Sequence, residues 1–394
     1  MAIILSDAGL HRHLLPLTYT RPVGALRVGI HTLGGMWQRM AGIPIGYRTE
    51  VYLQGKFPPV LAERSWEVLG GLLPTAELVS AVLDLEAGEV LLQAGRPLAF
   101  CSMGSAHAAE MDWIVPPAYL KQREYVGAAK IIERPWHVFQ FCGDAITNDF
   151  HFLTEGRRSA TISALNTVIG DPKLIFLEEG AQVEASILNT TKGPIWIGKD
   201  AEVMEGCMIR GPFALGEHAQ LKMGTKIYGA CSFGPECRVG GEVNNSVIQG
   251  YSNKGHDGFL GNSVLGEWCN LGADTNTSNL KNTYGEVKAW SYMDEALVDT
   301  GQQFLGLVMG DHAKSSINTM FNTGTVAGVC ANVFGSGFPP KHIPSFTWGG
   351  DGTYTLDKAL ATCEMVMERR NVPLTQEDRS ILEHIFGLTE AYRR

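Results

Sequence analysis

The clearest pattern in the chain is a six-residue recurrence of apolar side chains in its second half. Stepping by six from residue 197, eight consecutive positions are apolar: Ile197, Val203, Ile209, Leu215, Leu221, Ile227, Phe233 and Val239. This period matches neither the 3.6-residue turn of a helix nor the two-residue alternation of a strand. It fits a coil whose short parallel strands form the three sides of a prism, with the apolar residue pointing inward. The pattern predicts a left-handed parallel β-helix of hexapeptide repeats.

A second column lies four residues after each of these positions and holds mostly small or apolar residues: Ala201, Cys207, Phe213, Ala219, Thr225, Cys231 and Cys237. We expect them at the tight corners of the prism, with the cysteines as reduced packing residues. Glycines often follow the aliphatic position directly, at residues 198, 216, 234 and 240. Because glycine tolerates a positive φ, we expect these glycines to let the backbone turn.

The repeat is interrupted at definite places. Leu177 and Val183 precede it, and 14 residues then lead to Ile197, two more than two repeats. After Val239 the phase slips, and the expected inward residues resume at Phe259, Leu265 and Leu271. A longer excursion, about 277–306, precedes Met309, Ser315, Phe321, Ala327 and Val333. Loops that leave a rigid coil commonly bind ligands, so the breaks at 240–258 and 277–306 are the candidate site within a coil of about 175–340.

The flanking regions have a different character. Strand-like IILSD, GEVLLQAG and HVFQF and the helix-like run GALRVGIHTLGGMWQRM predict an α/β domain before the coil. After the coil, 356–370 and 375–392 predict two amphipathic helices separated by Pro373, which cover the coil end or a neighbouring subunit. We therefore expect an α/β domain over 1–170, a β-helix over 171–345 and a helical segment over 346–394.

The composition of the chain limits the classes of function that it can have. The 394 residues are 45% apolar, so the chain can bury a large core, and the net charge of −9 argues against a nucleic-acid binder or a membrane-surface protein. Neither a signal peptide nor a spanning segment is expected, which makes a cytoplasmic location the default. The eight cysteines form no C-x-x-C pair, and the eleven histidines show no metal-ligand spacing, so reduced thiols and no structural metal are expected.

The densest polar segment, 251–282, carries a recognisable motif. It contains Gly255-His256, Phe259-Leu260-Gly261-Asn262, Leu265-Gly266 and Asn270-Leu271-Gly272-Ala273, followed by Asn279. This order resembles the acetyltransferase half of the bifunctional N-acetylglucosamine-1-phosphate uridyltransferase/glucosamine-1-phosphate acetyltransferase family. The resemblance implies acetyl transfer from acetyl-CoA to an amino-sugar phosphate, with acetyl-CoA along the later coils at about 308–335.

The resemblance also implies roles for individual residues. His256 would be the general base for the attacking amine, a task that suits an imidazole. Asn270 and Asn279 would hold the amino sugar and orient the base, and the N–H of Ala273 would bind the thioester oxygen. The alternative is that His256 is a solvated loop side chain without a catalytic role and that Asn276, Asn279 and Asn282 only form turns.

The motif departs from the family in its sugar-phosphate contacts. Phe259 stands where the family has a tyrosine, and Asn244 and Asn245 stand where it has paired lysines. Lys222, Arg238 and Lys254 are candidates to supply the missing positive charge, and the substitutions also make a different acceptor sugar plausible.

A segment near the start resembles a degenerate nucleotidyltransferase signature; it reads LSDAGLHRHLLPLTYTRPV. Pro16-Leu17-Thr18 and Pro22 are in place, whereas His11, His13 and Val23 replace the second glycine, the arginine and the lysine. In active members the glycine loop cradles nucleotide phosphates. Candidates to supply the phosphate-binding charge are Arg12, Arg21 and Arg27. Candidates to ligate Mg²⁺ are Asp7 and Asp144.

Three hypotheses follow from these observations. The first is acetyl transfer on the coil with His256 as the base; the second is sugar-1-phosphate nucleotidyl transfer with Mg²⁺ and a nucleoside triphosphate in the first domain. The third is a non-catalytic, nucleotidyltransferase-like regulatory or scaffold subunit. The damaged signature favours the first and third, and the resemblance implies a homotrimer with the acyl site between subunits. We expect a divergent two-domain protein of the sugar-nucleotide pathway.

Overall fold

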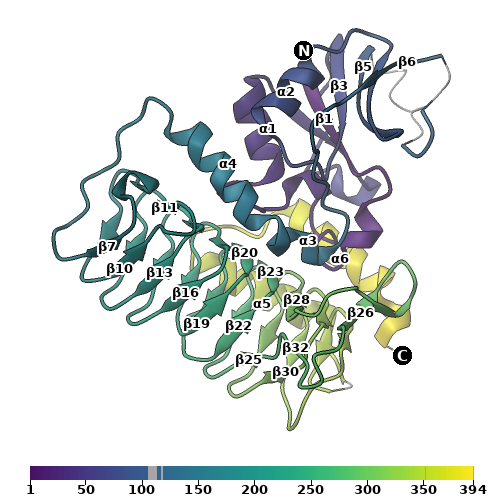
Figure 1. The fold of residues 1–394 in the computed structure, drawn as a ribbon. Helices are drawn as coiled ribbons and strands as arrows, with labels where there is room; N and C mark the ends of the chain where they lie inside the picture. Colours follow the sequence, from purple (N-terminus) through teal and green to yellow (C-terminus); the bar gives the residue numbers. More distant parts are fainter. Residues whose placement is uncertain (105–112, 117–118, 351, 394) are drawn as a thin grey trace. The chain divides into compact units, whose positions relative to one another are not determined.

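The computed structural model describes residues 1–104, 113–116, 119–350 and 352–393 (Figure 1). The chain forms two compact units. The first contains Met1–Leu14, Thr20–Leu26 and His31–Arg134, and the second contains Leu15–Tyr19, Arg27–Ile30 and Pro135–Arg394.

The first unit is built on a mixed sheet with the strand order β2-β1-β3-β5-β4-β6. Its strands are β1 (Ala2–Ser6), β2 (Ile45–Arg48), β3 (Arg64–Leu69), β4 (Glu89–Gln93), β5 (Arg96–Met103) and β6 (Lys121–Glu124). All five residues of β1 are buried, as expected for a central strand. The expected strands in IILSD and GEVLLQAG are present, and the predicted α/β class is confirmed.

The helices of this unit are shorter than the sequence pattern indicates. The predicted helical run 24–40 contains only α1 (Leu33–Ala41), which begins after Thr32, whose hydroxyl accepts a hydrogen bond from the Gly35 N–H. Before Thr32 the chain forms only the short 3-10 helix η2 (Val23–Ala25), which ends at Leu26 in an extended conformation. Thr75 caps α2 (Ala76–Leu83) in the same way as Thr32 caps α1.

The prediction of a strand in HVFQF is wrong. The segment lies in α3 (Pro135–Gln140), which begins with a proline, and is followed by α4 (Cys142–Thr154). Trp136, Val138 and Phe139 are buried, so the helix hides its side chains on more than one face. A short, nearly continuous apolar run does not distinguish a buried strand from a buried helix, and proline at the first helical position favours the helix.

The second unit is a parallel β-solenoid with three sheets, as the repeat predicts. Face 1 contains β7 (Thr167–Ile169), β10 (Ile187–Asn189), β13 (Met208–Arg210), β16 (Lys226–Tyr228), β19 (Glu242–Asn244) and β22 (Phe259–Gly261). Face 2 contains β8 (Ile175–Leu177), β11 (Ile195–Ile197), β14 (Phe213–Leu215), β17 (Cys231–Phe233), β20 (Val247–Gly250), β23 (Val264–Glu267), β28 (Leu307–Met309), β31 (Thr325–Ala327) and β33 (His342–Ile343). Face 3 contains β9 (Gln182–Val183), β12 (Glu202–Val203), β15 (Gln220–Leu221), β18 (Arg238–Val239), β21 (Asn253–Lys254), β24 (Asn270–Leu271), β29 (Lys314–Ser315), β32 (Asn332–Val333), β34 (Thr347–Trp348) and β35 (Gly352–Thr353).

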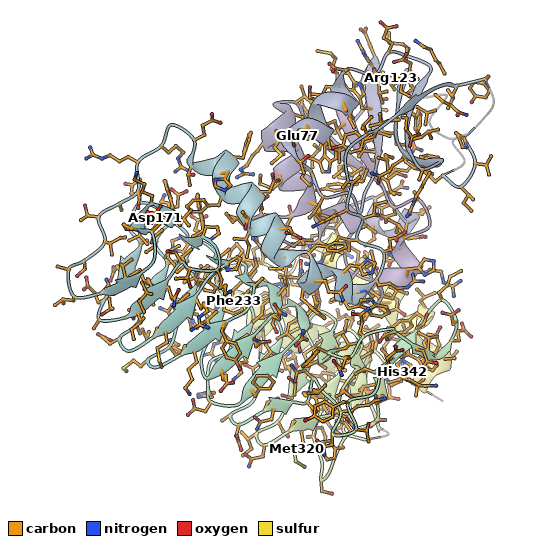
Figure 2. The ribbon with its side chains drawn as sticks, in the orientation of Figure 1. Glu77, Arg123, Asp171, Phe233, Met320 and His342 are labelled. Atoms are coloured by element: carbon orange, nitrogen blue, oxygen red, sulfur yellow. The ribbon has the colours of Figure 1, made fainter. Side chains whose placement is uncertain are left out.

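Eighteen residues, or three hexapeptides, make one regular turn. Leu215 pairs with Ile197 in the turn before it and with Phe233 in the turn after it. All eight residues of the inward column are buried in one apolar core, which also contains Cys207, Cys231 and Cys237. Phe233 can be found among the solenoid strands in Figure 2. The predicted inward column and the packing role of these cysteines are confirmed.

The role predicted for the glycines is wrong in its physical reason. Residues 198, 216, 234 and 240 do not have a positive φ; instead, left-handed residues such as Asp200, His218 and Glu236 follow two positions later. These glycines are needed for space, because a Cβ on Gly216 would lie 2.5 Å from the backbone of the next turn. The close stacking of the coils excludes a side chain there.

The phase break at 240–258 is a shortened turn, not a loop that leaves the coil. The partner of Val239 is Lys254, only 15 residues later, and β19, β20 and β21 all form within the segment. The inward residue of β22 is the fully buried Leu260 and not the expected Phe259, which lies on the outer side. The excursion after β25 (Asn276–Thr277) is confirmed and contains the antiparallel hairpin β26 (Lys288–Ser291) and β27 (Ala296–Asp299). The coil resumes with Met309 beside Leu265, and β25 pairs with β30 (Met320–Phe321).

The end of the chain contains the two expected helices, α5 (Leu356–Glu368) and α6 (Gln376–Leu388). Thr375 and Asp378 form a capping box at the start of α6. Phe386 of α6 packs edge-on against Phe346, with ring centres 5.0 Å apart. In Figure 1, α4 runs along the solenoid, where it contacts β14 and β17. Within the described ranges, every helix is too short or too polar to cross a bilayer.

We expect Gly216→Ala to lower the free energy of unfolding by about 1–3 kcal/mol, because the added methyl collides with the neighbouring turn. Gly387→Ala is the control: this glycine lies in α6, nothing lies within 4 Å of its Cβ position, and the change should stabilise by up to about 1 kcal/mol. Urea unfolding monitored by circular dichroism measures both. Equal midpoints for the two variants would contradict the packing role of the glycine.

Candidate functional site

The predicted base lies at an exposed corner of the solenoid. We call residues 255–258, between β21 on face 3 and β22 on face 1, the His256 corner. His256 is exposed, and in the described part of the chain its imidazole makes no hydrogen bond. Gly241 of the preceding turn lies directly against this corner, because a Cβ on it would approach the His256 carbonyl oxygen to 2.9 Å. The imidazole is therefore available to a ligand.

The next turn brings the predicted oxyanion donor to the same corner. Residues 272–275, which we call the Ala273 corner, join β24 to β25. The Asp274 N–H donates to the Asp257 carbonyl oxygen over 3.1 Å, so the two corners are bonded neighbours. The Ala273 carbonyl accepts from the Asn318 N–H over 2.9 Å, whereas the Ala273 N–H has no acceptor among the described residues. A free N–H and a free imidazole thus lie one turn apart.

Face 1 carries the predicted acceptor contacts Phe259 and Asn244, and the third, Asn279, follows β25 at the start of the excursion. Phe259 is paired with Glu242, and Asn244 is paired with Gly261. A Cβ on Gly261 would lie 2.5 Å from the Phe259 ring and 2.7 Å from the Asn279 amide nitrogen, so both side chains border this glycine. Asn279 donates to the Asn262 side-chain oxygen over 2.8 Å.

A groove on face 1 extends from this region towards earlier turns. It has a volume of about 430 Å³ and is lined by residues that include Met208, Arg210, Lys226, Tyr228 and Glu242. Its two cations were not among the predicted site residues. The hexapeptide pattern could have revealed them as outward-facing residues of face 1. Arg210 directly follows an inward residue of the pattern, and Lys226 directly precedes one.

Face 3 carries Asn270, on the other side of the corners. Its side-chain oxygen accepts from Asn253 over 3.4 Å, and Asn253 in turn accepts from Arg370 over 3.1 Å. Arg370 also pairs with Glu236 over 3.3 Å. The residues after α5 therefore support a predicted site residue, a link that the sequence pattern did not indicate because it depends on tertiary packing.

The predicted cations Lys222 and Arg238 lie on the turns below the His256 corner. Lys222 donates to the Gln220 side chain over 2.8 Å, and burial, followed by repulsion from Arg238, lowers its pKa. Arg238 is exposed on β18. Both remain accessible enough to meet an anionic ligand. Lys254 differs, because it is only 2% exposed and its ammonium donates to the His256 carbonyl oxygen over 2.6 Å.

The degenerate signature near the start of the chain is divided between the two units. Leu15–Tyr19, which holds Pro16, Leu17 and Thr18, and Arg27–Ile30 both belong to the second unit. The Arg27 guanidinium is buried and donates to the Gln249 carbonyl oxygen over 3.1 Å, while its backbone N–H donates to the Gln249 side chain over 2.6 Å. In the first unit Arg12 is exposed and Arg21 is 6% exposed.

The two histidines that replace signature residues have partners in the first unit. His11 lies 3.5 Å from the Tyr52 hydroxyl, and His13 lies 2.7 Å from the Arg134 guanidinium. Side chains therefore fill positions where active relatives keep glycine or a phosphate-binding cation.

The predicted Mg²⁺ ligands do not fit a metal site. Both carboxylate oxygens of Asp7 accept hydrogen bonds, one from the Val23 N–H over 2.8 Å and one from the Thr49 hydroxyl over 2.5 Å. Burial raises the pKa of Asp7 to about 7, so a proton competes with any cation. Asp144 belongs to α4 of the second unit, and the described residues contain no group of three or more side chains that could hold a metal ion.

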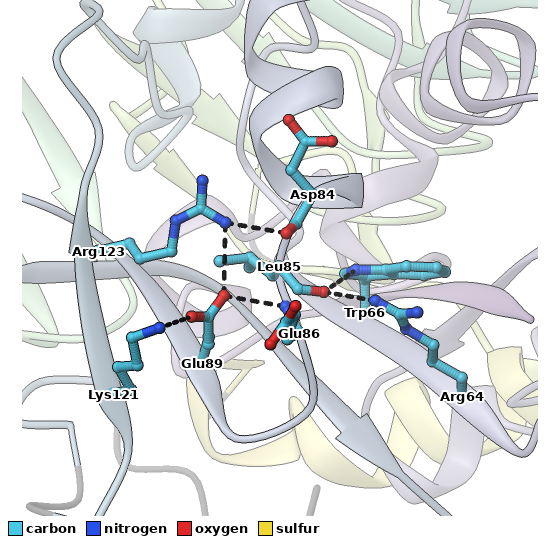
Figure 3. A network of polar contacts seen from close by, with 8 residues as sticks. All are labelled: Arg64, Trp66, Asp84, Leu85, Glu86, Glu89, Lys121 and Arg123. Carbon is cyan, nitrogen blue, oxygen red and sulfur yellow. Dashed lines mark hydrogen bonds and ion pairs between the residues drawn. The ribbon is translucent and has the colours of Figure 1, made fainter.

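A charged network stabilises the far edge of the first unit (Figure 3). Glu89 pairs with Lys121 over 2.7 Å and with Arg123 over 3.4 Å, which joins β4 to β6. The hydrogen bond from Lys121 lowers the pKa of Glu89 to about 2. Arg123 also donates to the Asp84 carbonyl oxygen, and Arg64 to that of Leu85. The network thus ties β6 to β4 and to the residues that follow α2.

Comparison with known proteins places these observations in a family context. Residues 3–158 match the sugar nucleotidyl transferase family. A bifunctional sugar-1-phosphate nucleotidylyltransferase/acetyltransferase from Sulfurisphaera tokodaii is 33% identical over 163 residues, which cover 41% of this chain and 40% of that protein. The bifunctional protein GlmU of Methanocaldococcus jannaschii is 33% identical over 87 residues, 22% of this chain and 21% of the relative.

These matches confirm the predicted resemblance at modest identity. The matched segments span about two fifths of the first relative and about one fifth of the second. The chain is thus similar over part of its length to bifunctional proteins of these names, and its residues 3–158 match the sugar nucleotidyl transferase family.

The Asp7 carboxyl gives a testable pH dependence. Its pKa is higher in the folded chain than the ordinary value of 3.8, so the folded state binds more protons than the unfolded state between about pH 4 and 7. Stability from this group therefore falls as the pH rises through that range. We expect Asp7→Asn to be relatively more stable than the parent protein at pH 8 than at pH 5.

Thermal unfolding at the two pH values, with and without Mg²⁺, measures this difference. Asp171→Asn is a control, because this exposed carboxylate only accepts a hydrogen bond from the Lys173 N–H. A parent protein stabilised by Mg²⁺ and an Asp7→Asn variant that loses this response would contradict the structural role of Asp7.

Proposed function

We propose that this protein is a transferase of the sugar-nucleotide pathway that moves an acetyl group from acetyl-CoA to an amino-sugar phosphate on its solenoid. The observation that carries the proposal is the stacking of the His256 corner on the Ala273 corner, joined by the Asp274–Asp257 hydrogen bond of 3.1 Å. Neighbouring parallel strands lie about 4.8 Å apart, so one small reacting group can contact both corners.

The proposed chemistry uses the two free groups. The His256 imidazole takes the proton of the substrate amine as its nitrogen attacks the thioester carbonyl carbon. The Ala273 N–H stabilises the negative charge that forms on the carbonyl oxygen. The carbon–sulfur bond then breaks, and the thiolate leaves with a proton as coenzyme A. We place acetyl-CoA along the later coils, about 308–335.

The side chains that would contact the acceptor sugar lie close to the two corners, where face 3 meets face 1. Phe259 offers an apolar surface to a sugar ring, and Asn244, Asn270 and Asn279 offer amide groups to its hydroxyls. Lys222 and Arg238 supply positive charge for a phosphate. Arg210 and Lys226 of the face 1 groove add to this charge, so cations are present even though asparagines occupy the lysine positions of the family.

We further propose that the protein is a homotrimer that assembles through its solenoid. Ile169, Ile187 and Met208 on face 1 are about two fifths exposed, at 43%, 38% and 41%. Adjacent exposed apolar side chains on one flat face favour contact with another copy of the chain. This part of the proposal rests on the exposed apolar surface of face 1.

A second candidate function is sugar-1-phosphate nucleotidyl transfer in the first unit, favoured by the family match over residues 3–158. The geometry favours a non-catalytic domain instead, because Asp7 is hydrogen-bonded and buried and Arg27 is occupied by backbone oxygens. We expect UTP, dTTP and GTP, each with Mg²⁺, to leave the melting temperature unchanged in a thermal-shift assay. A saturable increase with one nucleotide would favour the second candidate.

We expect His256→Ala to lower the rate of acetyl transfer by about 10²–10⁴-fold, with the melting temperature unchanged, because the exposed imidazole supports no packing. Release of coenzyme A from acetyl-CoA in the presence of a panel of amino-sugar phosphates measures the rate.

The matched control is His218→Asn, which changes another exposed histidine at a solenoid corner while tolerating its positive φ of 55°. This variant should retain the parental rate. Equal losses in both variants, or a His256→Ala protein that turns over normally, would contradict the assignment of the base.

A further inference from the structure

Lys254 occupies a position that every neighbouring turn gives to an uncharged residue. It belongs to β21 and points into the prism, in register with Val239 of the preceding turn. The corresponding inward residues of face 3 are Val183, Val203, Leu221, Val239, Leu271, Ser315 and Val333. Lysine is rarely buried unless it is paired, so its presence here costs stability and requires an explanation.

The Lys254 ammonium has one specific task in the structure. It is 2% exposed and donates to the carbonyl oxygen of His256 over 2.6 Å. Burial lowers the pKa of Lys254 to about 8, and the charges of Asp257 and Asp274 partly oppose this shift. The ammonium therefore belongs to the His256 corner and is shielded from a ligand on the surface.

Two other corners that follow a face 3 strand are closed by a threonine hydroxyl. The Thr225 hydroxyl donates to the Lys222 carbonyl oxygen, and the Thr319 hydroxyl donates to the Ser316 carbonyl oxygen over 2.8 Å. Each of these threonines directly precedes the next strand, and Gly258 holds that place before β22. The His256 corner has no hydroxyl of this kind, like the corner before β19, where Gly241 holds this place. At the His256 corner Lys254 supplies a bond to the backbone.

Gly258 cannot be replaced by threonine without disturbing the stack. Its φ is +117°, and a Cβ there would lie 2.3 Å from the Thr275 carbonyl oxygen of the Ala273 corner. The close contact between the two corners excludes a closing hydroxyl of the kind seen at Thr225 and Thr319, so the corner that carries the imidazole needs another group to bond its backbone.

We propose that Lys254 is a positioning residue that fixes the His256 corner, so that the imidazole faces the free N–H of Ala273. This inference rests on the proposed acetyl transfer for its functional meaning, but the support of the corner can be tested separately. The role needs the ammonium to be a hydrogen-bond donor at a fixed place. Methionine fills a similar volume and cannot donate.

The test compares Lys254→Met with Lys341→Met in the full-length protein. Lys341 is a matched control, because its ammonium also donates to a backbone carbonyl, that of Lys288, over 3.1 Å, away from the two corners. Hydrogen exchange of the backbone amides at 256–259 and at Asp274 reports on the corner. Coenzyme A release reports on transfer, and thermal unfolding reports on stability.

We expect Lys254→Met to increase amide exchange at the His256 corner by about 10-fold and to reduce transfer by about 10-fold, with the melting temperature equal to or above that of the parent. Parental transfer should decline as the pH rises through about 8, where Lys254 loses its proton, and this decline should be absent in the variant. Lys341→Met should match the parent in all three measurements.

The outcomes separate this inference from the proposed function. If the parent transfers no acetyl group but the corner still loosens in Lys254→Met, the proposed function fails and the support of the corner stands. Unchanged exchange at 256–259, or a loss of transfer that only accompanies a lower melting temperature, would overturn the positioning role.

Discussion

The structure of the second unit depends on the stacking of successive turns with one apolar side chain pointing inward at each sixth position. Backbone hydrogen bonds join each turn to the next, and the inward residues from 175 to 343 form one continuous core. Residues one turn apart lie in register, 18 positions apart in the regular turns and 17 apart in the turn that leads from His256 to Ala273, so a motif that is linear in the sequence becomes a ladder in space. The placement of His256 next to the Ala273 corner is a consequence of this register.

The same stacking explains where local rules are broken. Glycine is required at positions such as Gly216 because the next turn lies against its α-carbon. At Gly258 the same closeness excludes a threonine like those that close two other corners, and a buried lysine donates the hydrogen bond to the backbone. A charged group inside an apolar prism reduces stability, so its presence beside the exposed imidazole fits a functional demand on that corner.

The sequence predicted the solenoid well because a six-residue period has few other structural solutions. The pattern also predicted the excursion after Thr277. It indicated a loop at the shortened turn near Val239, because a turn that is three residues shorter than the others interrupts the six-residue period. Phe259 was expected inside and lies outside for the same reason. The short apolar run HVFQF could not distinguish a strand from the buried helix α3, and only tertiary packing decides between them.

Individual site residues were predictable to different degrees. His256, Ala273 and Asn270 follow from the motif, and the register brings the first two to one edge. The link from Arg370 to Asn253, which itself bonds Asn270, joins residues 117 positions apart, so no local pattern contains it. The signature segment near the start retains its prolines, yet Leu15–Tyr19 belongs to the unit of the solenoid, which sequence similarity alone does not indicate.

The central claim is that two adjacent corners form one acyl-transfer site. A crystal structure of the protein soaked with coenzyme A tests it most directly. The account predicts the thiol sulfur between the His256 imidazole and the Ala273 N–H, with the rest of the molecule along the later coils. Coenzyme A bound elsewhere on the solenoid, or absent from the corners at saturating concentration, would contradict the account.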